Sequence, residues 1–204
     1  MSDVLERFAP ATREWFRAAF VAPTRVQAGA WDAISAGRNA LVVAPTGSGK
    51  ALSAFLGASD SLIAEKAMRE PTPAEPAPGR RRRQPAPGTP PATRVLYISP
   101  LKALGVDVER NLRSPLVGIG LAARRLGLPS PEVRVGVRSG DTSASDRRRL
   151  VTDPPDILIT TPESLYLMLT SQAAKTLRGV RTVIIDEIHA VAATKRGAHL
   201  AVSL

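Results

Sequence analysis

Short apolar runs alternate with helix-forming segments along most of this chain, and this alternation restricts the fold more than any other feature. A run of roughly four to eight apolar residues between turn signals is typical of a strand buried on both faces. Such runs occur at residues 40–44, 94–99, 133–137, 156–160 and 182–186. Helical patterns lie between them, at residues 24–37, 50–66, 101–126, 143–151 and 161–169. The sequence therefore predicts an α/β fold with a parallel sheet, right-handed crossovers and helices on both faces.

The chain is long enough for one domain with its own core. It has 204 residues, 44% of them hydrophobic, so we expect a single domain over residues 1–204. Residues 70–93, EPTPAEPAPGRRRRQPAPGTPPAT, are rich in proline and lack apolar periodicity, which predicts a disordered insertion within that domain. The final HLAVSL has the pattern of a helix that begins without ending. We therefore expect the domain to be truncated at its C-terminal end.

Bulk properties narrow the classes of function. There are no cysteines, which excludes disulfides, thiolate metal sites and cysteine nucleophiles. No apolar run is long enough to span a bilayer and the first residues do not resemble a signal peptide, so we expect a cytoplasmic protein with no membrane partner. The net charge of +10 favours nucleic acid as a partner. The Arg80–Arg83 run is compatible with a solvated patch or with a loose nucleic-acid tether.

The segment APTGSGK, residues 44–50, follows an apolar run and precedes a helix, which is the setting of a phosphate-binding loop. Gly47 and Gly49 allow the backbone to curl, so that successive N–H groups point inward at phosphate oxygens. The predicted phosphate-binding residues are Thr46, Gly47, Ser48, Gly49, Lys50 and Ala51. The helix start adds a partial positive charge, and Lys50 would reach the β- and γ-phosphates. These residues predict a nucleotide site.

A second motif, VIIDEIH at residues 183–189, places two carboxylates at the end of a buried run. Asp186 is suited to hold Mg²⁺ and Glu187 to orient the attacking water of phosphoryl transfer. Exposed acids at a strand end are common, but here they share a predicted parallel sheet with a phosphate-binding loop. Lys50, Asp186 and Glu187 are therefore the predicted catalytic residues, with ATP and Mg²⁺ as cofactors.

APTGSGK together with DEIH resembles motifs I and II of the superfamily 2 helicases, whose ATP-binding domain is a RecA-like P-loop NTPase. Other segments match in the expected order: FVAPTRVQ (20–27) resembles the Q motif, SPLKAL (99–104) motif Ia and TTPESL (160–165) motif Ib, with RSGDT (138–142) between the last two. The amino-acid sequences of SPLKAL, RSGDT, TTPESLYLML and DEIHAVAATKRGAHLA more closely resemble those of the large helicase-related (Lhr) proteins of bacteria. The resemblance runs from near residue 10 to the end, apart from the proline-rich insertion.

The resemblance implies roles for individual residues. Gln27 would read the adenine edge, with Phe20 or a neighbouring aromatic available to stack on the ring. His189 would couple the nucleotide site to strand binding, with a structural polar contact as the other interpretation. Six residues would lie near single-stranded DNA or an RNA/DNA hybrid: Pro100, Lys102, Arg138, Gly140, Thr161 and Pro162. Thr161 and Pro162 also form a good helix start, and the two roles are compatible.

Nucleic-acid contact is expected to involve mainly the sugar–phosphate backbone. Trp15, Trp31, Tyr97 and Tyr166 are too few and too scattered for a base-stacking platform, so we expect them to be packing residues. For an intact protein the resemblance implies ATP-dependent movement 3′ to 5′ on single-stranded DNA, association with the bacterial nucleoid and a link to DNA repair.

Two features depart from the family pattern. Ala51 stands where the family has a threonine whose hydroxyl ligates Mg²⁺, so we expect nucleotide binding to survive and turnover to fall by orders of magnitude. The second RecA-like domain, a partner that supplies arginine fingers in the family, does not follow in this sequence, so we expect this chain alone not to unwind nucleic acid. The alternatives that stay open are a binding module without catalysis and a non-functional fragment.

Overall fold

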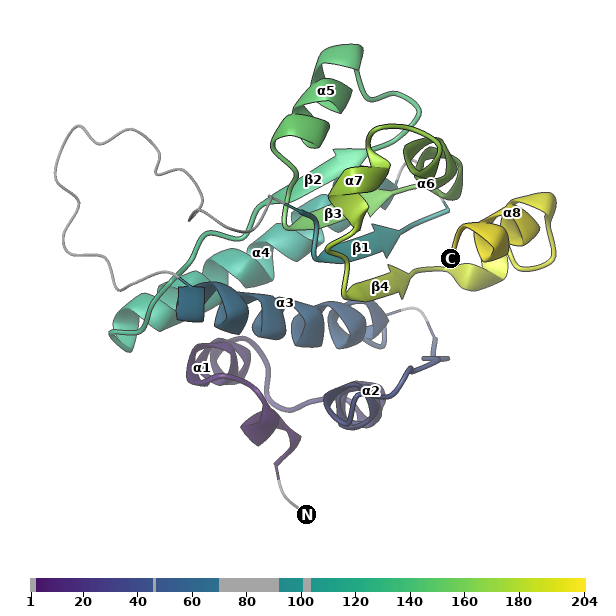
Figure 1. The fold of residues 1–204 in the computed structure, drawn as a ribbon. Helices are drawn as coiled ribbons and strands as arrows, with labels where there is room; N and C mark the ends of the chain where they lie inside the picture. The colour runs from purple at the N-terminus through teal and green to yellow at the C-terminus, as the bar shows by residue number, and fades with distance from the viewer. Residues whose placement is uncertain (1–2, 46, 70–91, 101–103) are drawn as a thin grey trace, which may run out of the picture. The chain divides into compact units, whose positions relative to one another are not determined.

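The computed structural model describes residues 3–45, 47–69, 92–100 and 104–204 (Figure 1). Its elements, in chain order, are η1 (Val4–Arg7), α1 (Pro10–Ala19), α2 (Arg25–Ser35), α3 (Lys50–Arg69), β1 (Val95–Ile98), α4 (Leu104–Arg125), β2 (Val135–Arg138), α5 (Ala144–Thr152), β3 (Ile157–Thr160), α6 (Pro162–Leu169), α7 (Ala174–Leu177), β4 (Thr182–Ile185), η2 (Ile188–Ala190) and α8 (Lys195–Ser203). By their internal contacts they form two units, Met1–Pro73 with Leu112–Glu132, and Ala74–Asn111 with Val133–Leu204.

The first unit has an aromatic core. Phe16 of α1 and Trp31 of α2 are almost fully buried, with ring centroids 5.5 Å apart and planes nearly perpendicular. Phe8 packs edge-on against Trp31, at 5.0 Å between centroids. Trp31 Nε1 donates a hydrogen bond of 3.0 Å to the carbonyl of Ser53 in α3, so the buried indole has a polar partner. This core holds α2 against α3, and α3 carries the glycine-rich turn at its start.

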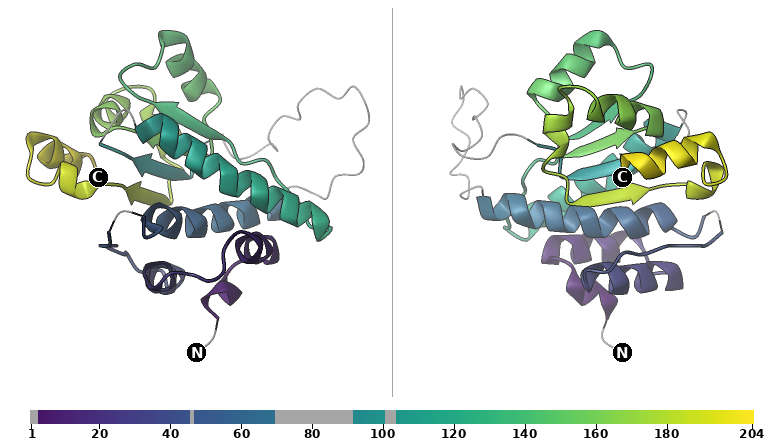
Figure 2. Two further views of the ribbon diagram at one scale, coloured as in Figure 1. Left: turned by 180° about the vertical axis from the view of Figure 1, so that it is seen from behind. Right: turned by 45° about the vertical axis from the view of Figure 1, so that its right-hand side comes forward.

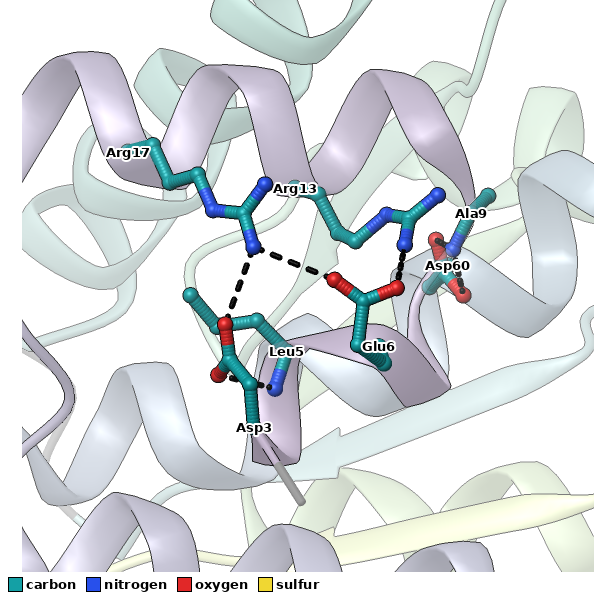
Figure 3. Close-up of polar contacts among 7 residues, drawn as sticks. All are labelled: Asp3, Leu5, Glu6, Ala9, Arg13, Arg17 and Asp60. Atoms are coloured by element: carbon teal, nitrogen blue, oxygen red, sulfur yellow. Dashed lines mark hydrogen bonds and ion pairs between the residues drawn. The ribbon is translucent and has the colours of Figure 1, made fainter.

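Polar contacts fix the N-terminal end of the same unit (Figure 3). Asp3 caps η1, and Arg17 of α1 donates to Asp3 at 2.9 Å and to Glu6 at 3.1 Å. On the other side, both carboxylate oxygens of Asp60 in α3 lie 3.2 Å from the backbone nitrogen of Ala9. Burial raises the pKa of the Asp60 carboxyl. These contacts hold the last turn of α1 on η1 and its start on α3.

The second unit contains a parallel four-stranded sheet in the order β2-β3-β1-β4. In the register, Ile98 of β1 pairs with Thr160 of β3 and with Ile185 of β4, and Arg138 of β2 pairs with Thr160. The four strands therefore end at the same edge of the sheet, as Figure 2 shows for this unit. The predicted α/β class with a parallel sheet is confirmed.

Both faces of the central strands are buried. Leu96, Ile98 and Leu158 on one face pack against residues of α6, α7 and α8. The alternate residues Tyr97 and Ile159 point to the opposite face and are buried as well. This two-sided burial explains why β1 and β3 appear in the sequence as continuous apolar runs without a period of two.

The strand predicted at residues 40–44 is wrong. The structure assigns no strand there, and Leu41 and Val43 are 79% and 82% exposed. The apolar run has the composition of a buried strand, but a strand also needs a neighbour to complete its hydrogen bonds and cover its side chains, which strand propensity does not guarantee. The other four predicted strands and all five predicted helical segments are confirmed within a few residues.

The predicted insertion at residues 70–93 falls largely outside the described residues. Of its residues, only Ala92 and Thr93 are described, and Thr93 is buried, with its N–H bonded to the carbonyl of Thr176 at 2.9 Å and its hydroxyl to that of Pro155 at 3.0 Å. The insertion itself therefore stays a prediction. Among the described residues, none of the helices has the length and apolarity that a membrane crossing requires.

Candidate functional site

The glycine-rich turn leads directly into α3. Gly47 and Gly49 have φ values of 83° and 81°, in the left-handed region that glycine adopts without strain. Lys50 is the first residue of α3, and its Nζ donates a hydrogen bond of 2.6 Å to the carbonyl of Ala44. The Ser48 hydroxyl is buried and has no hydrogen-bond partner among the described residues. Thr46 lies outside the described residues.

The start of α2 is attached to this turn. Thr24 and Gln27 form a capping box, in which Thr24 Oγ1 accepts from the N–H of Gln27 at 3.2 Å and Gln27 Oε1 accepts from the N–H of Thr24 at 2.9 Å. The Thr24 hydroxyl also donates to the carbonyl of Ser48 at 3.2 Å. Gln27 is 4% exposed, and its side-chain amide lies beside Gly49. The structure thus brings the predicted adenine-reading residue to the predicted phosphate-binding turn.

The turn has three properties that suit a phosphate group. Two positive φ values curl the backbone, a buried hydroxyl lacks a partner among the described residues, and the start of the helix that follows carries a partial positive charge. Phe20, the predicted stacking residue, is half-exposed and packs against Phe16 at 4.8 Å between centroids. Ala51 lies in the first turn of α3, and its methyl side chain has no oxygen that could ligate a metal ion.

In the second unit, the acidic pair follows the last strand of the sheet. The backbone N–H of Asp186 donates to the carbonyl of Ile98 at 2.9 Å, which continues the β1–β4 ladder by one residue. Its carboxylate accepts from the hydroxyl of Tyr97 at 2.7 Å and from the N–H of Glu187 at 2.9 Å. Burial, and then the charge of Asp186, raise the pKa of the Tyr97 phenol, which therefore stays a donor.

Glu187 adopts a backbone conformation that non-glycine residues rarely use. Its φ is 48°, the only positive value at a non-glycine residue in the described part of the chain. Such strain is concentrated at functional sites, where a side chain must be aimed in a fixed direction. The Glu187 carboxylate lies 3.3 Å from Nε2 of His189, the predicted coupling residue. Asp186, Glu187 and His189 thus form one short, turned segment beyond the sheet.

Metal ligands are sparse in this region. Across the described ranges, no three His, Cys, Asp or Glu side chains gather closely enough to enclose a metal ion. A magnesium ion bound by Asp186 would therefore complete its coordination with water and phosphate oxygens, which is how Mg²⁺ is held at nucleotide sites. The carboxylate of Asp186 is a hard oxygen ligand of the type that Mg²⁺ prefers.

Five of the six predicted nucleic-acid residues lie at or just beyond the same edge of the sheet. Pro100 follows β1, Arg138 ends β2 with Gly140 just after it, and Thr161 and Pro162 follow β3. Because the strands are parallel and in register, these positions are brought together although they span more than sixty residues of sequence. Thr161 caps α6 by accepting the N–H of Ser164 at 3.3 Å, so its predicted structural role is confirmed. Lys102 lies outside the described residues.

Arg138 is a buried cation without a described carboxylate partner. It is 8% exposed, and burial, followed by the charge of Arg147, lowers the pKa of its guanidinium. Arg147, from α5, donates to the carbonyl of Gly140 at 2.7 Å, while its buried Nε has no partner among the described residues. Two neighbouring guanidinium groups that have no carboxylate partner in the described part of the chain are suited to an anion such as a backbone phosphate.

The sequence did not single out Arg196, which joins two of these loops. From α8, its Nη2 donates to the carbonyl of Pro100 at 2.7 Å and its Nε to the carboxylate of Glu163. The hydrogen bond from Arg196 lowers the pKa of Glu163. An arginine in a basic TKRG segment has no pattern that would announce this role, since both partners are distant in sequence. Tyr97 was missed as a site residue for the same reason, since its partner Asp186 lies 89 residues away. Arg147 was also missed, although its partner Gly140 lies only seven residues before it.

Comparison with known proteins places these features in a family. The family model for DEAD/DEAH box helicases matches residues 24–204. A Lhr helicase/probable uracil glycosylase of Mycolicibacterium smegmatis is 61% identical over 203 residues, covering 100% of this chain and 12% of that protein. A Lhr helicase/uracil glycosylase of Escherichia coli is 55% identical over 199 residues, covering 97% of this chain and 12% of that protein.

A solved structure agrees with these sequence comparisons. The Mycobacterium smegmatis helicase Lhr bound to ssDNA and AMP-PNP matches with a TM-score of 0.84 and 58% identity, over 99% of this chain and 23% of that one. The chain thus spans only a small part of the relatives that it matches. It belongs to the DEAD/DEAH box helicases and, within them, to the Lhr helicase family.

Proposed function

We propose that this chain is the ATP-binding and single-stranded-nucleic-acid-binding lobe of an Lhr-type, ATP-dependent helicase. The glycine-rich turn carries the proposal, because its two positive-φ glycines and its attachment to Gln27 prepare a phosphate site at the start of α3. The structure of the relative bound to ssDNA and AMP-PNP supports the same two ligand classes here.

In the proposed nucleotide site, the N–H groups of residues 46–51 bind the triphosphate. Lys50 would exchange its bond to the neutral carbonyl of Ala44 for phosphate oxygens, since a charge-assisted hydrogen bond to an anion is stronger. Gln27 would select adenine with the part of its amide that the capping box leaves free.

The acidic segment would carry out the remaining chemistry. Asp186 would hold Mg²⁺, which neutralises charge that develops on the β- and γ-phosphates when bound. Glu187 would orient the attacking water, and its strained backbone supports a requirement for a fixed direction. His189, next to Glu187, would relay the state of the nucleotide to the strand-binding loops.

The nucleic-acid strand would lie along the edge where the parallel strands end. Loops at such an edge offer backbone N–H groups and hydroxyls to a sugar–phosphate backbone. We assign this contact to Pro100, Arg138, Gly140, Thr161 and Pro162, with Lys102 beside them. DNA and an RNA/DNA hybrid both present the phosphates that these groups would bind.

Movement on nucleic acid belongs to a longer protein in this proposal. The chain spans 12% of the two bacterial relatives, and 3′-to-5′ translocation, a second RecA-like lobe and a role in DNA repair are proposed for the whole protein. A second candidate, a binding module without catalysis, is favoured by one observation, which is that Ala51 offers no metal ligand where the family has threonine.

A titration of ATP with and without Mg²⁺ tests the nucleotide site. We expect this chain to bind ATP, Lys50→Ala to abolish binding, and Ala51→Thr to gain strongly from Mg²⁺ because a metal ligand is restored. If none of the three proteins binds ATP, the proposed site is contradicted.

The two candidate functions separate in a protein that also contains the second lobe. Ala51→Thr should restore DNA-stimulated ATP hydrolysis if the chain is a damaged enzyme. Unchanged hydrolysis in that protein would support the binding module.

A further inference from the structure

We propose that Tyr97 is a positioning residue for Asp186, holding its carboxylate in the orientation that a nucleotide-bound divalent cation requires. This inference rests on the proposed function, in which Asp186 holds Mg²⁺. Tyr97 lies in the middle of β1 and is 1% exposed, so its sequence context predicts nothing but core packing. Its hydroxyl, however, donates a hydrogen bond of 2.7 Å to Asp186 Oδ2.

The register of the sheet explains how a residue of one strand reaches the end of another. Tyr97 pairs with Ile184 of β4, and side chains alternate between faces along a strand. Asp186 comes two residues after Ile184, so it projects on the same face as Tyr97. A long side chain can span this diagonal step, whereas the aliphatic residues that dominate these strands carry no donor.

An aspartate needs such contacts because its last torsion is weakly restricted. The χ2 angle of Asp is broad, and a carboxylate held at one oxygen still turns. Here each oxygen has its own donor, since Oδ1 accepts from the N–H of Glu187 at 2.9 Å and Oδ2 accepts from Tyr97. Partners that orient a metal-binding carboxylate in this way typically change metal affinity by about 10- to 100-fold when they are removed.

The test compares Tyr97→Phe with Tyr166→Phe, in the Ala51→Thr background where Mg²⁺ dependence is expected. Tyr166, the other tyrosine of the chain, is half-exposed, and no hydrogen bond of its hydroxyl is recorded in the described part of the chain. With AMP-PNP bound, Tyr97→Phe should weaken Mg²⁺ affinity by about tenfold. Affinity for AMP-PNP without metal should stay unchanged in both variants, as should Mg²⁺ affinity in Tyr166→Phe.

A second measurement keeps the inference testable without nucleotide. In ¹H–¹⁵N spectra of the chain alone, Tyr97→Phe should shift the amide of Glu187, because the carboxylate that accepts this proton loses its other anchor. Tyr166→Phe should leave that amide in place. An unchanged Glu187 amide, or unchanged Mg²⁺ affinity in Tyr97→Phe, overturns the role of Tyr97. Failure of the parent protein to bind AMP-PNP instead contradicts the proposed nucleotide site.

Discussion

The side-chain amide of Gln27 lies so close to the backbone of Gly49 that a Cβ at residue 49 would fall 2.5 Å from Gln27 Nε2. Gly49 is therefore required for two separate reasons, which are its φ of 81° and this contact. Gly47 shares the first reason, with a φ of 83°, but a Cβ there would meet no atom within 4 Å. Comparing substitutions at Gly47 and Gly49 therefore separates the cost of backbone strain from the cost of the clash with Gln27.

We expect Gly47→Ala to cost about 1 kcal/mol of unfolding free energy from strain alone. Gly49→Ala should cost about 1–3 kcal/mol more, because Gln27 must leave its capping position. Urea unfolding measures both variants. Adding Gln27→Ala should remove the difference between them, and equal costs in the presence of Gln27 would contradict the contact.

Thr24→Ala should weaken ATP binding as well as stability. The variant loses an N-cap, worth about 1 kcal/mol, and the hydrogen bond from Thr24 to the carbonyl of Ser48. Ser143→Ala is the matched control, because Ser143 caps α5 by accepting the N–H of Asp146 and takes no part in the turn. Thermal unfolding should show similar losses, while an ATP titration should separate the two. Equal ATP affinities would show that the cap does not organise the turn.

Arg147→Ala should reduce affinity for single-stranded DNA at low salt. If Arg147 and Arg138 bind a phosphate together, the slope of log affinity against log salt should become shallower by about 0.7. Arg148→Ala removes the same charge from an exposed position of α5 and serves as the control. Fluorescence anisotropy across a salt series gives both slopes. A slope that changes equally in the two variants would assign the effect to net charge.

Glu163→Gln should show how far the ion pair between Glu163 and Arg196 contributes to the free energy of unfolding, and how that contribution depends on pH. The contact with Arg196 lowers the pKa of Glu163 from its ordinary value of 4.5, so the contact stabilises the fold at neutral pH and is lost as the pH falls through the lowered pKa. Both side chains are half-exposed, and the pair is worth about 0.5 kcal/mol. Urea unfolding at pH 7 should therefore show Glu163→Gln less stable than the parent by that amount. The difference should shrink at pH 3, and a difference that persists there would refute the ion pair as its origin.

Local sequence patterns were sufficient to predict most secondary-structure elements of this protein and the family to which it belongs. Apolar runs bounded by turns gave β1 to β4, and caps such as Thr161 followed by Pro162 fixed where helices begin, because these signals act over a few neighbouring residues. Gly47 and Gly49 are also a local signal, since a positive φ is a requirement of the turn itself.

Tertiary structure decided what local signals could not. The apolar run at 40–44 satisfies every local condition for a strand, yet pairing depends on a neighbour, and the structure leaves Leu41 and Val43 exposed. Tyr97 and Arg196 entered the candidate sites through register and helix packing with partners far away in sequence, whereas the partner of Arg147 lies only seven residues before it. The residue type determines which interactions a side chain can make. Which group it contacts depends on the long-range pairing of strands and the packing of helices.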